Sequence, residues 1–107
     1  MICEPDDFLL VAQKWATDSA KVMVSLMVFD DPKEPVFVWR VAGRLLRVED
    51  RKVSVAFPDD GVLLIDVTQW AEIGYANGRA LPASAGIDED LCLSRPGAML
   101  HIWTTLP

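Results

Sequence analysis

The stretch VAGRLLRVEDRKVSVAFPDDGVLLIDVTQW, residues 41–70, decides the fold, because it contains two turn signals between runs of alternating apolar residues. Residues 49–52, EDRK, predict one hairpin connection. Asp60 followed by Gly61 predicts a second, since both residues tolerate the positive φ that tight hairpin turns require. The stretch therefore predicts three antiparallel strands, and the two that follow the first turn cover residues 53–57 and 62–67.

The first of these strands changes its alternation in the middle. Residues 36–48 are long for one strand, and the apolar positions switch from odd to even numbers near Gly43. A β-bulge or sharp bend at Gly43 would restore one buried face, because an extra residue reverses the side of every later side chain. The inward positions expected on this basis are Phe37, Trp39 and Val41 before the glycine and Leu46 and Val48 after it.

The residues before this stretch predict a helix, a strand and a loop. Pro5 suits the first turn of a helix over about residues 5–17, whose apolar side chains recur every three or four residues. Residues 21–29 contain mostly apolar residues without polar alternation, which is typical of a strand covered on both faces. Residues 30–35, DDPKEP, predict a charged loop, because proline cannot donate to a β-ladder. The apolar stripe of the helix consists of Phe8, Val11, Ala12 and Trp15.

The residues after the stretch complete one domain. Residues 70–75 fit either a further strand or a helical turn. Residues 76–90 predict a loop, and residues 91–105 predict a last hairpin around an Arg-Pro-Gly turn. With a β meander over about residues 21–75, the chain is expected to form a single domain over residues 1–107. Its class is α+β, an N-terminal helix followed by a highly bent antiparallel sheet or a small, partly open β-barrel.

This arrangement resembles the Sm-like and SH3-like small barrels in shape. GRLLRVEDRKVSVAF, residues 43–57, resembles the second and third strands of an Sm protein in its residue pattern. The likeness in shape covers about residues 22–75. The strand-edge residues by which Sm proteins bind RNA are not recognisable in this sequence. The resemblance therefore implies a barrel-like shape and assigns no site residue.

Composition and charge narrow the function classes. The 107 residues include 51% hydrophobic residues, as in a folded globular domain, and carry a net charge of −6. Such a charge disfavours nucleic-acid binding and favours basic or neutral partners. Two widely separated cysteines and an acidic N-terminus predict free thiols, no secretory signal and a cytoplasmic location. The longest apolar stretch, residues 22–29, is too short for a membrane helix, so no membrane association is expected.

No constellation of residues points to catalysis, a cofactor or a metal. His101 is the only histidine, and a structural or solvent-edge role is expected for it. Cys92 lies between two leucines, which is typical of an inert buried thiol. Asp59, Asp60 and Asp66 lack the spacing of a calcium loop and are explained by turn chemistry. The chain is therefore expected not to be an enzyme, and no catalytic, cofactor-binding or metal-binding residue is assigned.

Arginines and two tryptophans are the candidate contact residues. Residues 40–52 contain five basic and two acidic residues in an otherwise acidic chain. If the strand bends at Gly43, Arg40 and Arg47 emerge on one outer face with Arg44 near the corner. This stripe could bind a phosphate, a carboxylate or an acidic protein surface, or it could be a solvated strand face. Trp70 and Trp103 are candidate interface aromatics, with core packing as the alternative role.

These observations lead to three hypotheses. The first is a non-catalytic domain that acts by protein association, either with itself through an exposed sheet edge or with another chain. The second is a binder of nucleic acid or of another anionic ligand through Arg40, Arg44 and Arg47. The third is an acidic inhibitor of a basic enzyme, with Asp59, Asp60 and residues 88–90 as its contact charges.

Overall fold

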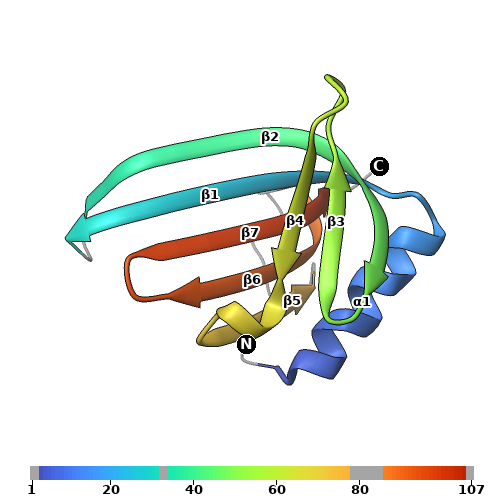
Figure 1. The fold of residues 1–107 in the computed structure, drawn as a ribbon, viewed down its shortest axis with the longest axis horizontal. Coiled ribbons are helices and arrows are strands. Elements are labelled where there is room, and N and C mark those ends of the chain that lie inside the picture. Colours follow the sequence, from blue (N-terminus) through green and yellow to red (C-terminus); the bar gives the residue numbers. More distant parts are fainter. Residues whose placement is uncertain (1–2, 32–33, 78–85, 106–107) are drawn as a thin grey trace.

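The computed structural model describes residues 3–31, 34–77 and 86–105 and contains one helix and one antiparallel sheet of seven strands (Figure 1). The elements are α1 (Pro5–Thr17), β1 (Lys21–Asp31), β2 (Glu34–Glu49), β3 (Lys52–Ala56), β4 (Val62–Asp66), the 3₁₀ helix η1 (Val67–Gln69), β5 (Glu72–Asn77), β6 (Ile87–Arg95) and β7 (Ala98–Thr105). The helix covers the residues predicted for it, and the α+β class is confirmed. None of the described helices has the length and apolarity needed to cross a membrane.

The sheet is bent but not closed. Its strand order is β4-β3-β2-β1-β7-β6-β5, so β4 and β5 are the two ends, and no pairing joins them in the described residues. The long strands β1 and β2 form an arm with β6 and β7, while the β3–β4 hairpin crosses in front of that arm (Figure 1). The predicted bending of the sheet agrees with this arrangement, whereas the barrel and its likeness to Sm-like and SH3-like proteins are not confirmed.

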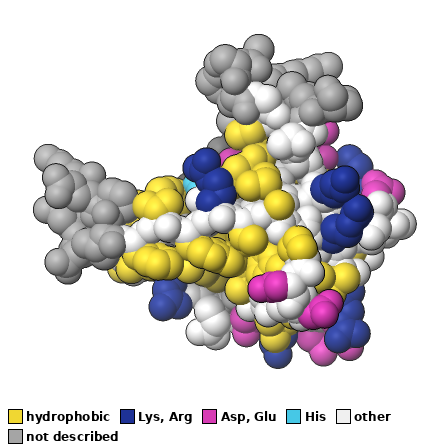
Figure 2. All heavy atoms as spheres, turned by 90° about the horizontal axis from the view of Figure 1, so that it is seen from above, with side chains coloured by type: hydrophobic (Ala, Val, Ile, Leu, Met, Phe, Trp, Pro, Cys, Tyr) yellow, Lys and Arg dark blue, Asp and Glu magenta, His cyan; other side chains and the backbone are white. Residues whose placement is uncertain are grey.

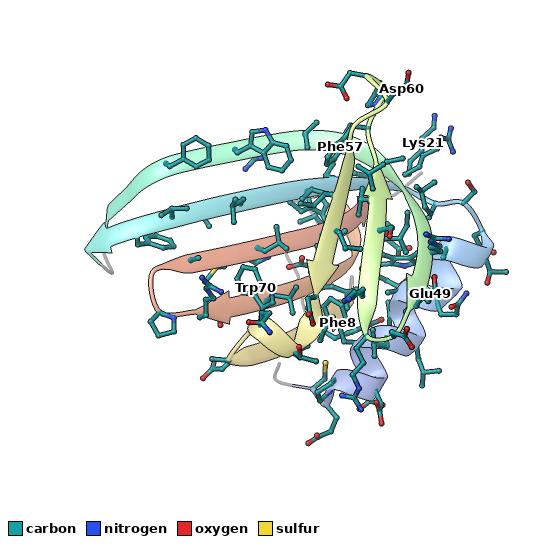
Figure 3. The ribbon with its side chains drawn as sticks, in the orientation of Figure 1. Phe8, Lys21, Glu49, Phe57, Asp60 and Trp70 are labelled. Carbon is teal, nitrogen blue, oxygen red and sulfur yellow. The ribbon has the colours of Figure 1, made fainter. Side chains whose placement is uncertain are left out.

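The hydrophobic core lies on the concave face of the sheet, which we call the inner face. Helix α1 packs there against β2 and β5 and contributes the buried side chains of Phe8, Ala12 and Trp15 (Figure 3). Every strand adds inward side chains to the same core. They include Val22, Val24, Leu45, Val53, Val55, Ile65, Ile73, Leu91, Leu93, Leu100 and Ile102.

The bulge in β2 lies later than predicted. The pairing with β3 shifts between Leu45 and Arg47, so Leu46 is the extra residue and the alternation reverses there rather than at Gly43. Leu45 is consequently buried, while the side chain of Leu46, predicted to be inward, is exposed. Phe37 has the inward parity but is also exposed, because neither α1 nor the β3–β4 hairpin extends over that end of the arm.

Both hairpins of the opening stretch are confirmed, but the second connection covers residues 57–61 and is longer than the tight turn predicted from Asp60 and Gly61. Asp50 and Arg51 adopt positive φ values of 51° and 63° between β2 and β3. Asp60 has a φ of 67° in the longer connection between β3 and β4, at the tip shown in Figure 3.

Three further predictions need correction. The loop expected at residues 30–35 is shorter, because Asp31 pairs with Glu34 and Phe29 pairs with Pro35. The loop expected at residues 76–90 is wrong at both ends, because β5 continues to Asn77 and β6 already begins at Ile87; residues 78–85 lie outside the described residues. The predicted cover on both faces of β1 is incomplete on the outer face, where Ser25 is buried but Met23 and Met27 are only half-buried. Residues 72–77 form a strand, which settles the alternative left open there.

Candidate functional site

Among the described residues, one long edge of the arm has no neighbouring strand. Strand β3 pairs with β2 only from Arg44 onward, so residues 37–43 of β2 pair with β1 alone in the described structure. The Leu45 N–H donates to the Ala20 carbonyl on the β1 side, at 3.1 Å. Since backbone groups alternate sides along an antiparallel strand, those of Val38, Arg40 and Ala42 point away from β1. We call residues 37–43 the free edge.

The free edge exposes apolar side chains on both faces. Phe37 on the inner face is 50% exposed, and Val38 on the outer face is 54% exposed. Figure 2 looks onto the side of the molecule where β2 is uppermost and shows hydrophobic side chains in a band along the arm. Long apolar strands with unpaired backbone groups are sites where another chain can add a strand.

The three candidate arginines lie on the outer face of β2. Arg44 pairs with Ala56 and Arg47 pairs with Ser54, two residues that share one face of β3. The bulge at Leu46 therefore keeps Arg40, Arg44 and Arg47 on one side of the sheet, as predicted for Arg40 and Arg47.

Each of these three arginines makes a different contact. The Arg40 guanidinium lies 5.6 Å from the ring centroid of Trp103. Arg44 donates from Nη1 to the Ser19 carbonyl at 3.1 Å. Arg47 Nε lies 3.7 Å from an oxygen of Glu49, in an exposed ion pair. Arg40 thus lies on the free edge and Arg44 directly follows it, whereas Arg47 lies beyond the bulge.

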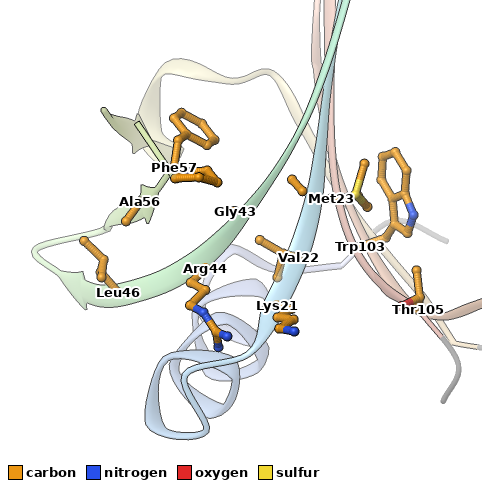
Figure 4. A pocket seen from close by; sticks show the side chains of 12 residues that line it. Lys21, Val22, Met23, Gly43, Arg44, Leu46, Ala56, Phe57, Trp103 and Thr105 are labelled. Atoms are coloured by element: carbon orange, nitrogen blue, oxygen red, sulfur yellow. The ribbon is translucent and has the colours of Figure 1, made fainter. Parts of the chain in front are cut away.

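A pocket of about 610 Å³ opens on the outer face at the end of the free edge, where β3 begins to pair with β2 (Figure 4). Lys21 and Arg44 supply its two charged side chains. A Cβ on Gly43 would lie only 2.7 Å from the Ala56 carbonyl oxygen, so glycine permits the close approach of β2 and β3 there. The other lining residues are Val22, Met23, Ala42, Leu46, Ala56, Phe57, Pro58, Trp103 and Thr105.

The two candidate interface tryptophans do not share a surface. Trp103 lines the outer pocket beneath Arg40. Trp70 follows η1 and lies on the inner side, beside a smaller cavity of about 280 Å³ that Trp39 also lines. An arginine, Arg95, lies 5.6 Å from its ring centroid.

A cluster that the sequence analysis did not predict lies farther along the outer face. His101 on β7 pairs directly with Cys92 on β6, and Asp90 lies two residues from Cys92 on the same face. His101 Nδ1 is 3.2 Å from both carboxylate oxygens of Asp90. Its Nε2 is 3.6 Å from Cys92 Sγ and 3.1 Å from Met99 Sδ. The hydrogen bond to Asp90 and then the contact with Cys92 raise the pKa of His101 to about 10, in spite of its burial.

The sequence contained a signal for this pairing. A two-residue turn at Pro96 and Gly97 places Arg95 opposite Ala98, and counting back along both strands places Cys92 opposite His101. Cys92 is only half-buried, unlike the buried thiol expected from its leucine neighbours.

Most acidic candidates have partners within the molecule. Asp59 Oδ1 accepts the Gly61 N–H at 3.1 Å, and Asp66 accepts the backbone N–H and the hydroxyl of Thr68. Glu89 accepts from Tyr75 Oη at 2.7 Å, and Asp90 contacts His101. The described His, Cys, Asp and Glu side chains include no group of three or more that could hold a metal ion.

Comparison of the chain with protein-family models, with curated proteins and with solved structures finds no match.

Proposed function

We propose that this protein acts by association with another protein, and that the free edge of β2 binds an extended segment of that partner. The segment would add a strand along residues 37–43, with its backbone bonded to Val38, Arg40 and Ala42. The observation that carries this proposal is the unpaired, apolar edge itself, with Phe37 and Val38 half exposed.

Charge complementarity favours a partner segment with acidic residues on one face. Lys21, Arg40 and Arg44 all lie on the outer face at the free edge or at its pocket, and in the described structure no carboxylate lies within ion-pair distance of any of them. These cations stand out in a chain of net charge −6. A second copy of this chain would place its own Arg40 and Arg44 against the same cations, which disfavours self-association.

A displayed library of random 12-residue peptides tests the proposal. We expect selected peptides to alternate apolar with Asp or Glu residues and to bind more weakly as salt is raised. Val38→Pro removes one outward N–H without touching the ladder to β1, so the fold should be kept. Its binding of a selected peptide should fall about tenfold, as expected for one or two lost backbone hydrogen bonds and their strand contacts.

Val38→Thr is the matched control, because it keeps the N–H and the β-branched shape. The proposal fails if no peptide is selected, if Val38→Pro and Arg40→Glu bind the selected peptides as the wild type does, or if the protein forms a self-paired oligomer through this edge at pH 7. A closed ring of several subunits, as the Sm-like resemblance would suggest, belongs to the last of these outcomes.

The outer pocket supports a narrower form of the anion-binding hypothesis. We propose as the second candidate that Lys21 and Arg44 bind the carboxylate of a small ligand whose apolar body fills the pocket beside Phe57 and Trp103. Arg47 takes no part, because it is paired with Glu49 beyond the bulge. The probe is dodecanoate, measured by calorimetry.

Lys21→Gln and Arg44→Gln should each weaken dodecanoate binding severalfold, while Val38→Pro should leave it unchanged. Equal binding by the charge variants would contradict this second candidate. The inhibitor hypothesis has less support, since Glu89 and Asp90 have partners inside the molecule and only Asp88 of residues 88–90 is exposed.

A further inference from the structure

The Asp90, His101 and Cys92 cluster takes no part in the proposed binding surfaces. It lies on the outer face of β6 and β7, separated from Arg40 of the free edge by Ser25 of β1 in one cross-strand row. The cluster brings together a nucleophile, a group that transfers protons and a carboxylate that orients that group. His101 and Asp90 are largely shielded, with side chains 27% and 14% exposed.

We propose that Cys92 is a site of reversible oxidation by hydroperoxides, in which His101 holds the thiolate as an ion pair and Asp90 orients the imidazolium. The geometry supports each role. Both oxygens of Asp90 lie at 3.2 Å from Nδ1, which directs Nε2 toward the sulfur atoms of Cys92 and Met99. A thiolate is a stronger acceptor than the Met99 thioether, so the Nε2–H is expected to donate to Cys92 once the thiol is deprotonated.

The reaction balances with the peroxide as the only co-reactant. The Cys92 thiolate attacks one peroxide oxygen, so an S–O bond forms and the O–O bond breaks. The leaving hydroxide, or alkoxide, takes the Nε2 proton of His101 and departs as water or alcohol. The sulfur is oxidised to sulfenic acid, the peroxide is reduced, and His101 is left neutral. Two equivalents of a cellular thiol can then return the sulfenic acid to the thiol: the first forms a mixed disulfide and water, and the second releases Cys92 and forms the disulfide of the cellular thiol.

Cys3 provides a control within the same chain. Burial and the nearby carboxylate of Asp7 raise the pKa of the Cys3 thiol. At neutral pH, Cys3 is therefore the protonated, less reactive thiol, and no imidazole contacts it among the described residues. The two cysteines are the only ones in the chain, so each single substitution isolates the other.

The test compares Cys3→Ser, which retains Cys92, with Cys92→Ser, which retains Cys3. The rate of sulfenic acid formation with hydrogen peroxide is measured by dimedone trapping and mass spectrometry between pH 6 and pH 9. We expect Cys92 to react at least about tenfold faster than Cys3 at pH 7, since only the thiolate is nucleophilic. The rate at Cys3 should still rise with pH over this range, because the raised pKa keeps its thiol protonated at pH 7.

Substitutions of the residues around Cys92 show which of them causes its faster oxidation. In the Cys3→Ser background, Asp90→Asn and His101→Gln should each lower the rate at pH 7 about tenfold, whereas Met99→Leu, which keeps the size and removes the competing acceptor, should not lower it. If His101→Gln does not fold, Asp90→Asn decides the question. The proposal is overturned if Cys92 and Cys3 react at equal rates with the same pH profile, or if Asp90→Asn reacts like its parent.

Discussion

At the scale of single residues, Gly43 fixes the course of the sheet. Its hydrogen occupies a space where a Cβ would approach the Ala56 carbonyl oxygen to 2.7 Å, and that oxygen belongs to the β2–β3 ladder. We expect Gly43→Ala to destabilise the fold by about 1–3 kcal/mol, because backbone must shift to accept the methyl group. Urea unfolding measures this. Gly61→Ala is the control, since its nearest neighbour is a movable Asp59 oxygen; an equal loss in both variants would contradict the role of Gly43.

Glu89 links α1 to the sheet through its hydrogen bonds. Trp15 Nε1 donates to it at 3.2 Å, Lys14 Nζ at 3.3 Å and Tyr75 Oη at 2.7 Å. Burial raises the pKa of Glu89, but these hydrogen bonds outweigh burial and the pKa lies below its ordinary value. The bond with Glu89 also raises the pKa of Tyr75 to about 12.

A carboxyl with a lowered pKa stabilises the folded state above its unfolded value of 4.5, and the stabilisation is lost as pH falls through the folded value. Glu89→Gln should therefore lower the free energy of unfolding by about 1–3 kcal/mol at pH 7. The difference from wild type should shrink below pH 4.5. Urea unfolding at pH 7, 5 and 3.5 measures this, and Glu49→Gln, in an exposed pair, should have little effect at any pH. A difference that does not depend on pH would contradict the account.

At the scale of elements, α1 is held to the sheet by the side chains on one of its faces. Phe8 is completely buried, whereas Leu10 is 69% exposed on the other side. Phe8→Ala should cost about 3–5 kcal/mol in the free energy of unfolding. Leu10→Ala should change it by less than about 0.5 kcal/mol. Thermal and urea unfolding of both variants would contradict this packing if the two losses were equal.

The elements that could be predicted from the sequence are those with local signals. The helix follows from a stripe of apolar residues, and the turn at residues 49–52 from residues that accept positive φ. The position of the bulge was predicted three residues early, because Leu45 and Leu46 are equally suited to the inner face and only the pairing with β3 distinguishes them. The start of β6 was missed since its charged residues, such as Glu89, are satisfied by distant partners.

At the scale of the whole molecule, the candidate sites depend on which strands become neighbours. No local pattern states that β3 leaves β2 at Arg44, so the exposed edge could be expected but not located from the sequence. The arginine stripe was predictable because all three arginines belong to one strand. The different contacts of these arginines could not be predicted, since Trp103, which lies against Arg40, and Ser19, which accepts from Arg44, come from other parts of the chain. The same holds for His101 and Asp90, which share a site only through the register of β6 and β7.

Net charge and the free edge together determine how the molecule behaves as pH falls. At pH 7 the charge of −6 keeps copies apart, but the charge vanishes near pH 4.5 while Phe37 and Val38 remain exposed. We expect self-association to appear near pH 4.5, because loss of the net charge leaves only Arg40 and Arg44 to oppose the pairing of two apolar edges. Val38→Lys should suppress it, since a lysine on an edge strand opposes pairing. Leu10→Lys makes the same change of charge on α1, far from the edge, and should not. Light scattering of the three proteins at pH 7 and pH 4.5 measures the effect, and equal suppression by both variants would show that net charge alone, and not the free edge, controls association.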